Sequence, residues 1–110
     1  MRTIMEEQRV KLDSNGYAPT ILQSKQECWV SHQTGVDLVR HEVFGGYANR
    51  SLSKRYGLWV WLTPHWHNMS KEGVHFNKPL DLKLKRFAQA EFEVNYPDLD
   101  FVKIFGKNYL

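Results

Sequence analysis

The fold is decided by the stretch from Arg40 to Asn77, RHEVFGGYANRSLSKRYGLWVWLTPHWHNMSKEGVHFN, which contains four of the five histidines and three of the four tryptophans. It predicts a strand that delivers His41, a Gly-Gly turn, a basic segment and an apolar strand from Leu58 to Leu62. Pro64 then opens a helix that carries further histidines, and His75 follows in a loop. A hairpin followed by a helix brings imidazoles together, so we expect a site for one divalent metal.

Length and composition set the class of protein. A chain of 110 residues with 42% hydrophobic and 14% aromatic residues suits one folded domain with a single core. No segment approaches the roughly 20 apolar residues of a membrane span, and the N-terminus shows no secretory signal. The one cysteine, Cys28, cannot form an internal disulfide. We therefore expect a cytoplasmic protein with no membrane partner.

Positive charge is concentrated around the histidines. The whole chain has a formal net charge of +3, but residues 40–86 hold nine Lys or Arg against three acidic residues, a net of +6 that leaves −3 for the rest. Such a distribution is typical of a protein that contacts a phosphate backbone. For Lys83, Lys85 and Arg86 the alternative is equally open, namely the solvated face of a helix.

Capping residues and periodicity predict the other elements. Asn77 is a suitable N-cap with Pro79 in the first turn, and apolar residues repeat at helical spacing to about Asn95. Turn residues and shorter apolar runs complete the prediction. The remaining expected elements are a strand at Glu27 to Val30, a strand at Val36 to Val43, a helix at Arg50 to Tyr56 and a closing helix near Leu99 to Phe105.

Several fragments occur in an order that is more specific than any one of them. They are Cys28 to Ser31, Arg40 to Gly46, Ala48 to Arg50, Ser53 to Gly57, His67 to Ser70, Gly73 to Asn77 and Phe105 to Leu110. In this order the chain resembles the small HNH-like (ββα-metal, His-Me finger) endonucleases encoded by phages and prophages of Gram-positive bacteria. The resemblance covers roughly residues 20–110.

The resemblance implies an α+β fold with a ββα-metal core and C-terminal helices, in the cytoplasm of a bacterial host cell. The core would span residues 27–77, between an N-terminal arm at 1–26 and a C-terminal helical extension at 78–110. In many relatives a zinc knuckle ties the hairpin together. Because only one thiolate donor occurs at the matching positions, we predict no structural zinc and expect tryptophans to fill the space. These positions hold Cys28, Ser31, Thr63 and Trp66.

The resemblance also assigns the chemistry. His41 stands at the position of the general base, and a neutral imidazole suits that task because its unperturbed pKa lies near 6.5. The position before it usually supplies a metal ligand, but Arg40 has no lone pair to offer. The metal would then be held by His67 and His75, with Asn68 or water. Such an open site suits Mg²⁺, Mn²⁺, Ni²⁺ or Zn²⁺ according to supply.

Further residues receive supporting roles. Cations that could contact nucleic-acid phosphates are Arg40, Arg50, Lys54 and Arg55, for which solvation is the alternative. Asn49 lies near the asparagine that ties the family's loop together, Glu42 either orients His41 or lies on the surface, and His65 is a supporting or solvent residue.

The leading hypothesis is a phage-type, metal-dependent DNA endonuclease or nickase that hydrolyses phosphodiester bonds. Its first alternative is a catalytically degenerate nucleic-acid-binding module of the same fold, motivated by Arg40 at a ligand position. The second is an interaction protein that acts on recombination or defence factors through an aromatic surface. DNA is the expected partner, and a homodimer is left open.

Overall fold

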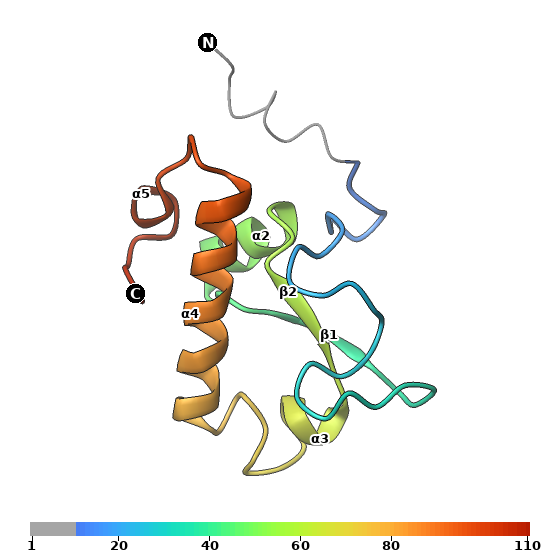
Figure 1. Cartoon of the computed structure of the whole chain (residues 1–110). Coiled ribbons are helices and arrows are strands. Elements are labelled where there is room, and N and C mark those ends of the chain that lie inside the picture. Colours follow the sequence, from blue (N-terminus) through green and yellow to red (C-terminus); the bar gives the residue numbers. More distant parts are fainter. Residues whose placement is uncertain (1–10) are drawn as a thin grey trace.

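The computed structural model describes residues 11–110, so the first ten residues of the predicted arm lie outside the described part of the chain. A two-stranded antiparallel sheet is combined with helices, which confirms the α+β class. Figure 1 shows the arrangement. In chain order the elements are β1 (Val39–Glu42), α2 (Tyr47–Arg55), β2 (Trp59–Leu62), α3 (Pro64–His67), α4 (Lys78–Asn95) and α5 (Phe101–Phe105).

The hairpin of β1 and β2 separates two environments. His41 pairs with Val60, and Arg40 pairs with Trp61. Because successive side chains of a strand point to opposite faces, His41 and Val60 lie on one face and Arg40 and Trp61 on the other. On the first face His41 is 6% exposed and Val60 is 0% exposed. The register therefore places the imidazole of His41 on one face of the sheet and the guanidinium of Arg40 on the other.

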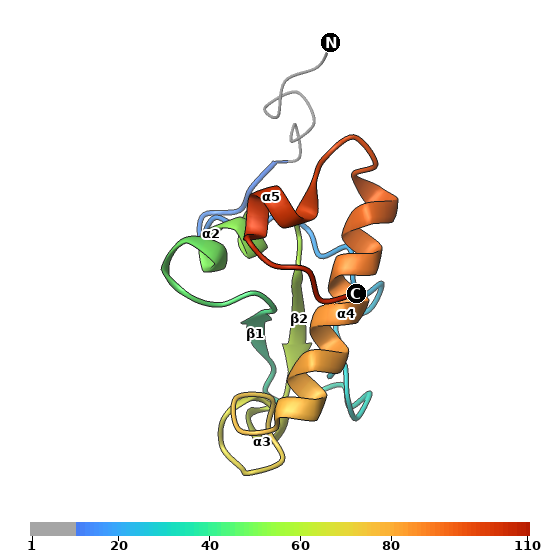
Figure 2. The same cartoon turned by 90° about the vertical axis from the view of Figure 1, so that its left-hand side faces the viewer.

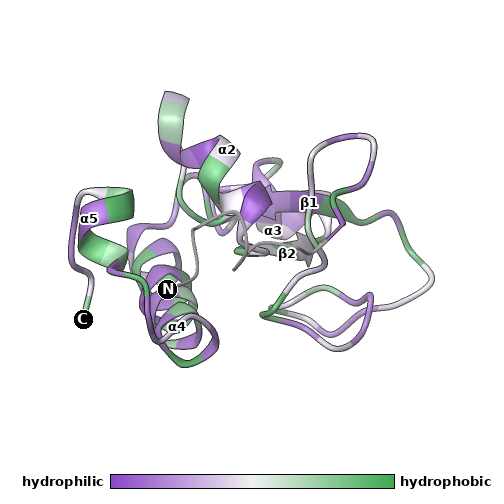
Figure 3. Ribbon diagram, turned by 90° about the horizontal axis from the view of Figure 1, so that it is seen from above, coloured by the Kyte–Doolittle hydropathy of each residue, from purple (hydrophilic) through white to green (hydrophobic). Residues whose placement is uncertain are grey.

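Helix α4 covers one side of the hairpin. Asn77 caps it by accepting a hydrogen bond from the Leu80 N–H at 3.2 Å, and the helix ends at Asn95 as its periodicity predicts. Its buried residues include Leu84 and Phe92. The helix runs alongside the strands, with α2 and α5 near one end and α3 near the other (Figure 2). Its ribbon carries both hydrophilic and hydrophobic residues, as expected of a helix with one buried face (Figure 3).

Phenylalanines rather than tryptophans build the end of the core beneath α5. The ring of Phe44 lies 5.0 Å from the rings of both Phe101 and Phe105. Ser53 fixes this end of the hairpin, because its hydroxyl donates to the Phe44 carbonyl at 2.9 Å and accepts from the Phe44 N–H at 3.1 Å. Tryptophans were expected in another region, around Cys28, and there Trp29 and Trp66 pack against the core as partly buried residues. Trp59 is buried on the opposite face of the hairpin.

Two expected strands differ from the structure. Glu27 to Val30 is not a strand, because the chain bends here and turns at residues 29–31, where the Cys28 N–H donates to the Gln33 carbonyl and the His32 N–H donates to the Cys28 carbonyl. One backbone bond, from Trp29 to Trp61 at 2.8 Å, joins this turn to β2. The strand that carries His41 is β1, Val39–Glu42, which is shorter than the expected strand from Val36 to Val43.

The segment before β1 lies on the side of the hairpin that α4 leaves uncovered (Figure 1). The Ala18 N–H donates to Lys54 at 2.9 Å, and the Ile21 N–H donates to Gly57 at 3.0 Å. Gly57 has a φ of +71°, and a Cβ there would collide with the Pro19 carbonyl oxygen. Close backbone contact therefore ties this segment to the body. In the described part of the chain, no helix has the length and apolar character needed to cross a membrane.

Candidate metal centre

Three histidines from different elements converge at one end of the hairpin. His41 comes from β1, His67 ends α3, and His75 lies in the loop that follows. One ring nitrogen of each lies within 4.8 Å of the others, and the Nε2 atoms of His67 and His75 are 2.9 Å apart. These three residues are the histidine cluster. The structure thus brings together the imidazoles that the sequence predicts to meet.

A tight return of the chain places His75 beside His67. After α3 the backbone folds back, so that the Val74 N–H donates to Trp66 at 2.8 Å and the His75 N–H donates to His67 at 3.1 Å. Gly73 makes this return possible. A Cβ at Gly73 would lie 2.7 Å from the His67 carbonyl oxygen, which is closer than real side chains approach. This glycine therefore supports the site.

His41 is the buried member of the cluster. Its Nε2 atom has no hydrogen-bond partner among the residues that the structure describes. Burial above all, together with the electrostatic effect of His67, His75 and Lys85, lowers the pKa of His41 to about 3. The imidazole is therefore neutral near pH 7 and offers a lone pair to an ion or a proton.

His67 is held in the neutral form by similar forces. Burial lowers its pKa, His75 adds to the effect, and the negative charge of Glu42 opposes it. At 2.9 Å, two neutral rings satisfy each other only if one Nε2 donates and the other accepts. A cation bound by both Nε2 atoms is the other arrangement that this separation allows.

The donor set can be tested against a divalent ion. Two nitrogens bound at about 2.1 Å lie about 3 Å apart at a right angle and at most about 4.2 Å apart. The His67 and His75 pair, at 2.9 Å, meets this condition as it stands. His41, whose ring nitrogen lies within 4.8 Å of those of the other two, can reach the same ion after a small shift or through a water molecule. The residues therefore fit one ion with two direct ligands and His41 beside it.

A hollow of about 360 Å³ gives access to the cluster. Asn68 follows α3 and lines this hollow with an exposed side chain, so its amide oxygen is available as a further ligand. Arg50 and Glu42 also line it, and their side chains approach to 3.9 Å. The lining residues are Arg40, His41, Glu42, Val43, Gly45, Arg50, His67, Asn68 and His75.

The guanidinium of Arg40 lies on the other face of the hairpin. Its Nη1 donates to Asp13 Oδ2 at 2.9 Å. Its Cζ lies over three aromatic rings, at 4.3 Å from the centroid of Tyr17, 4.9 Å from that of Trp59 and 5.2 Å from that of Trp61. Strand alternation turns the guanidinium of Arg40 away from the His41 ring, and the phosphate contact expected of Arg40 stays a prediction.

The other predicted cations and supporting residues are spread around the site. Lys54 donates to the Asn15 carbonyl at 3.3 Å, and Arg55 is exposed at the end of α2. His65 lies 3.2 Å from a Glu72 carboxylate oxygen and does not join the cluster. The phosphate contacts expected of Arg50, Lys54 and Arg55 stay predictions.

Asn49 and Glu42 have contacts that sequence reasoning did not predict. Asn49 Nδ2 donates to the Phe105 carbonyl at 3.1 Å, so it joins α2 to α5 rather than the loop of the histidines. Burial and the charge and hydrogen bond of Glu42 raise the pKa of Tyr17 to about 12. The neutral Tyr17 hydroxyl thus donates a hydrogen bond to the Glu42 carboxylate.

The four positions that match the zinc knuckle do approach one another. Cys28 Sγ lies 3.9 Å from Thr63 Oγ1, and Thr63 Oγ1 accepts from the Trp66 N–H at 3.5 Å. Cys28 is a buried, free thiol. Burial raises its pKa, but hydrogen bonds led by the Ser31 side chain outweigh that effect and lower the pKa overall. The absence of a structural zinc stays a prediction.

Lys85 contributes charge to the site from α4. The sequence left open whether it contacts phosphate or lies on a solvated helix face. In the structure it is half-buried, pairs with Asp81 at 2.8 Å and acts on His41. Its position on the helix turn next to the buried Leu84 and Ala88 was the available signal. It brings a positive charge to the histidine cluster from α4.

Comparisons with family models, with curated proteins and with solved structures found no match to this chain. The chain's own residues therefore carry any functional conclusion. Chemically, the histidine cluster can bind a divalent ion through neutral imidazoles and can accept a proton at His41.

Proposed function

We propose that the chain is an HNH-like, ββα-metal DNA endonuclease or nickase of phage type, which hydrolyses phosphodiester bonds with one divalent ion. The convergence of His41 with His67 and His75 carries this proposal. The order of the elements supports it, because the hairpin β1–β2 comes before α3 and each of these parts contributes to the cluster.

In the proposed reaction, metal binding and proton transfer are carried out by different histidines. His67 and His75 hold the ion through Nε2 atoms that already lie 2.9 Å apart, and Asn68 or water completes the coordination. When bound, the ion supplies a Lewis acid that stabilises charge on the phosphate oxygens and the leaving oxygen. His41 is neutral and has an unpartnered Nε2, so it can take a proton from the attacking water.

Positive charge near the hollow supports a phosphate ligand. Arg50 lines the hollow, with Lys54 and Arg55 one turn further along α2. Glu42 offsets part of the charge of Arg50 at 3.9 Å. Such cations hold a DNA backbone without reading its sequence, so the proposal predicts salt-dependent binding with little sequence preference.

A plasmid-nicking assay tests the proposal. Supercoiled plasmid is incubated with the protein and Mg²⁺, Mn²⁺, Ni²⁺ or Zn²⁺ in turn, with EDTA as the metal-free reference. We expect nicking with at least one metal and its loss in His67→Ala. His32→Ala is the matched control, because the His32 side chain is 71% exposed and outside the cluster. Equal activity of His67→Ala and the wild type would contradict the proposal.

A second candidate function is a nucleic-acid-binding module of the same fold without catalysis. The low pKa of His41, about 3, favours it because so weak a base accepts a proton from water less readily. In addition, no carboxylate of the described residues joins the histidine cluster. Salt-dependent DNA binding without cleavage under any of the four metals would select this function.

A further inference from the structure

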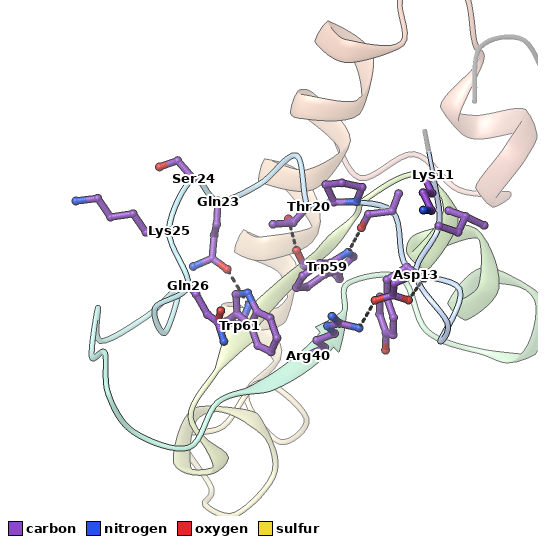
Figure 4. A pocket seen from close by; sticks show the side chains of 14 residues that line it. Lys11, Asp13, Thr20, Gln23, Ser24, Lys25, Gln26, Arg40, Trp59 and Trp61 are labelled. Carbon is purple, nitrogen blue, oxygen red and sulfur yellow. Dashed lines mark hydrogen bonds and ion pairs between the residues drawn. The ribbon is translucent and has the colours of Figure 1, made fainter. Parts of the chain in front are cut away.

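The hairpin face opposite the histidine cluster carries a second hollow that the proposed function does not use. Its volume is about 540 Å³, against about 360 Å³ for the hollow at the cluster. Figure 4 shows it between the strands and the segment that precedes them. It is large enough for a ligand of small-molecule size. Its lining residues come from residues 11–26, β1 and β2.

Two tryptophans form one wall of this hollow and are held in fixed positions. Trp59 is 4% exposed, and its Nε1 donates to the Ala18 carbonyl at 2.8 Å. The backbone N–H of Trp61 donates to Gln23 Oε1 at 2.7 Å, and the Trp61 ring meets that of Trp59 edge to face, with centroids 5.2 Å apart. Trp61 is only half-buried. It therefore offers a preorganised aromatic surface to a ligand.

The hollow is positively charged. Arg40 lies beside the tryptophans and is neutralised in part by Asp13, at 2.9 Å. Lys11 and Lys25 also line the hollow and are exposed, which leaves three cations against one carboxylate. In Figure 4, Lys25 and Lys11 stand at opposite ends of the row of side chains. The charge suits an anion that extends across the hollow, and the aromatic wall suits a planar ring.

We propose that this hollow binds an unpaired nucleotide of single-stranded DNA, with its base stacked on Trp61 and its flanking phosphates held by Lys25 and Arg40. Aromatic platforms within a basic groove are the usual means of binding single strands, because every base has a face that stacks. This inference rests on the proposed function in taking DNA as the ligand. It specifies a substrate with a single-stranded segment.

Adjacency in β1 links this hollow to the histidine cluster. Arg40 and His41 are consecutive residues whose side chains leave opposite faces of a two-stranded sheet. A single strand of DNA that passes around the edge of the hairpin would place a base on Trp61 and a nearby phosphodiester beside His41. We therefore expect cleavage close to a junction between single-stranded and duplex DNA.

Binding measurements without metal test this inference. Fluorescence anisotropy is recorded with a labelled oligothymidine and with a labelled duplex of equal length, in EDTA and at several salt concentrations. Trp61→Ala should weaken oligothymidine binding by about fivefold to a hundredfold, the range expected for loss of one stacked base. Lys25→Glu should also weaken it and lower its salt dependence, and duplex binding should change less in both variants.

Matched variants keep the test decisive. Trp61→Phe retains a stacking ring and should bind nearly as well as the wild type, which separates stacking from any loss of folded protein. Lys103→Glu makes the same charge change as Lys25→Glu at an exposed position on α5, outside the hollow, and should have the smaller effect. Wild-type affinity for oligothymidine in both Trp61→Ala and Lys25→Glu would overturn the inference.

The outcomes also separate this inference from the proposed nuclease. Plasmid nicking by a wild-type protein that fails to bind oligothymidine would overturn the single-strand site and leave the nuclease. Oligothymidine binding that depends on Trp61, in a protein that cleaves nothing, would overturn the nuclease and leave the site.

Discussion

The Nε2 atoms of His67 and His75 lie 2.9 Å apart, although eight residues separate them in the chain. Two nitrogens bound to one ion at about 2.1 Å and a right angle would lie about 3 Å apart. Because both rings already stand at that separation, metal binding requires little rearrangement of the loop.

Removing either of these histidines should therefore weaken metal binding. We expect His67→Ala and His75→Ala each to lower the affinity for Ni²⁺ at least about tenfold, since an open site with few protein ligands depends on each of them. Isothermal titration calorimetry measures the change. His65→Ala is the control, because His65 pairs with Glu72 outside the cluster. Unchanged affinity in both test variants would contradict the ligand assignment.

Gly73 allows a second, backbone-based test of the same site. In Gly73→Ala the new Cβ would lie 2.7 Å from the His67 carbonyl oxygen, so the loop must shift and carry His75 away. We expect a loss of about 1–3 kcal/mol in the free energy of unfolding, together with weaker Ni²⁺ binding. Denaturant titration and calorimetry measure the two effects.

Gly45→Ala is the matched control for this substitution. Gly45 lines the same hollow, but a Cβ there meets no atom within 4 Å. Its stability and metal affinity should stay close to those of the wild type. The close-approach argument fails if the two glycine variants bind Ni²⁺ equally well.

The local features of the fold could be predicted because they are encoded in neighbouring residues. Asn77 and Pro79 mark the start of α4 by hydrogen bonding and by a fixed φ, and the helical spacing of apolar residues gives its length. The apolar run before Thr63 predicts β2, because a short continuous apolar run is typical of a buried strand. The order of hairpin and helix indicated that imidazoles could come together, and the resemblance to HNH-like proteins singled out His41, His67 and His75.

Long-range partners could not be predicted in the same way. Arg40 and His41 are neighbours in sequence, and which face of the strand each occupies follows from the pairing with β2. The carboxylate that neutralises Arg40 comes from Asp13, 27 residues away. No local pattern marks Asp13 as that partner. The Arg40 environment, and with it the second hollow, therefore became visible only in the structure.

The stability of the metal-free protein should fall in mild acid because of His41. Its pKa is about 3 in the folded protein, against 6.5 as its usual value, so the unfolded chain binds more protons between these values. The contribution is fully present above pH 6.5 and is lost as the pH falls toward 3. Between pH 7 and pH 5 the expected loss is about 2 kcal/mol, and the lowered pKa of His67 adds to it in the same direction.

Urea titrations in EDTA at pH 7 and pH 5 measure this loss. His41→Gln provides the comparison, because glutamine does not titrate in this range. Its free energy of unfolding should depend less on pH than that of the wild type. An identical pH dependence in both proteins would show that His41 is not the group responsible.

Cys28 should contribute packing rather than zinc binding. Its side chain is fully buried and lies 3.9 Å from the Thr63 hydroxyl. Cys28→Ala removes one sulfur atom and should cost about 1 kcal/mol of stability through a small cavity. Elemental analysis of the purified wild type should find no zinc that is lost in Cys28→Ala. Stoichiometric zinc that disappears with this substitution would mean that the thiol is a ligand.

The last prediction separates catalysis from DNA binding. His41→Ala should lower the rate of nicking by about 10² to 10⁴-fold, as expected for loss of a general base, with little change in DNA affinity. Arg50→Ala should instead weaken DNA binding and reduce its salt dependence by about one counterion, because Arg50 lines the hollow with a cation. Both variants are compared with the wild type on one DNA substrate, after circular dichroism has shown that each is folded. A His41→Ala protein that nicks at the wild-type rate would remove His41 from the mechanism, whereas equal loss of DNA affinity in both variants would place His41 in binding.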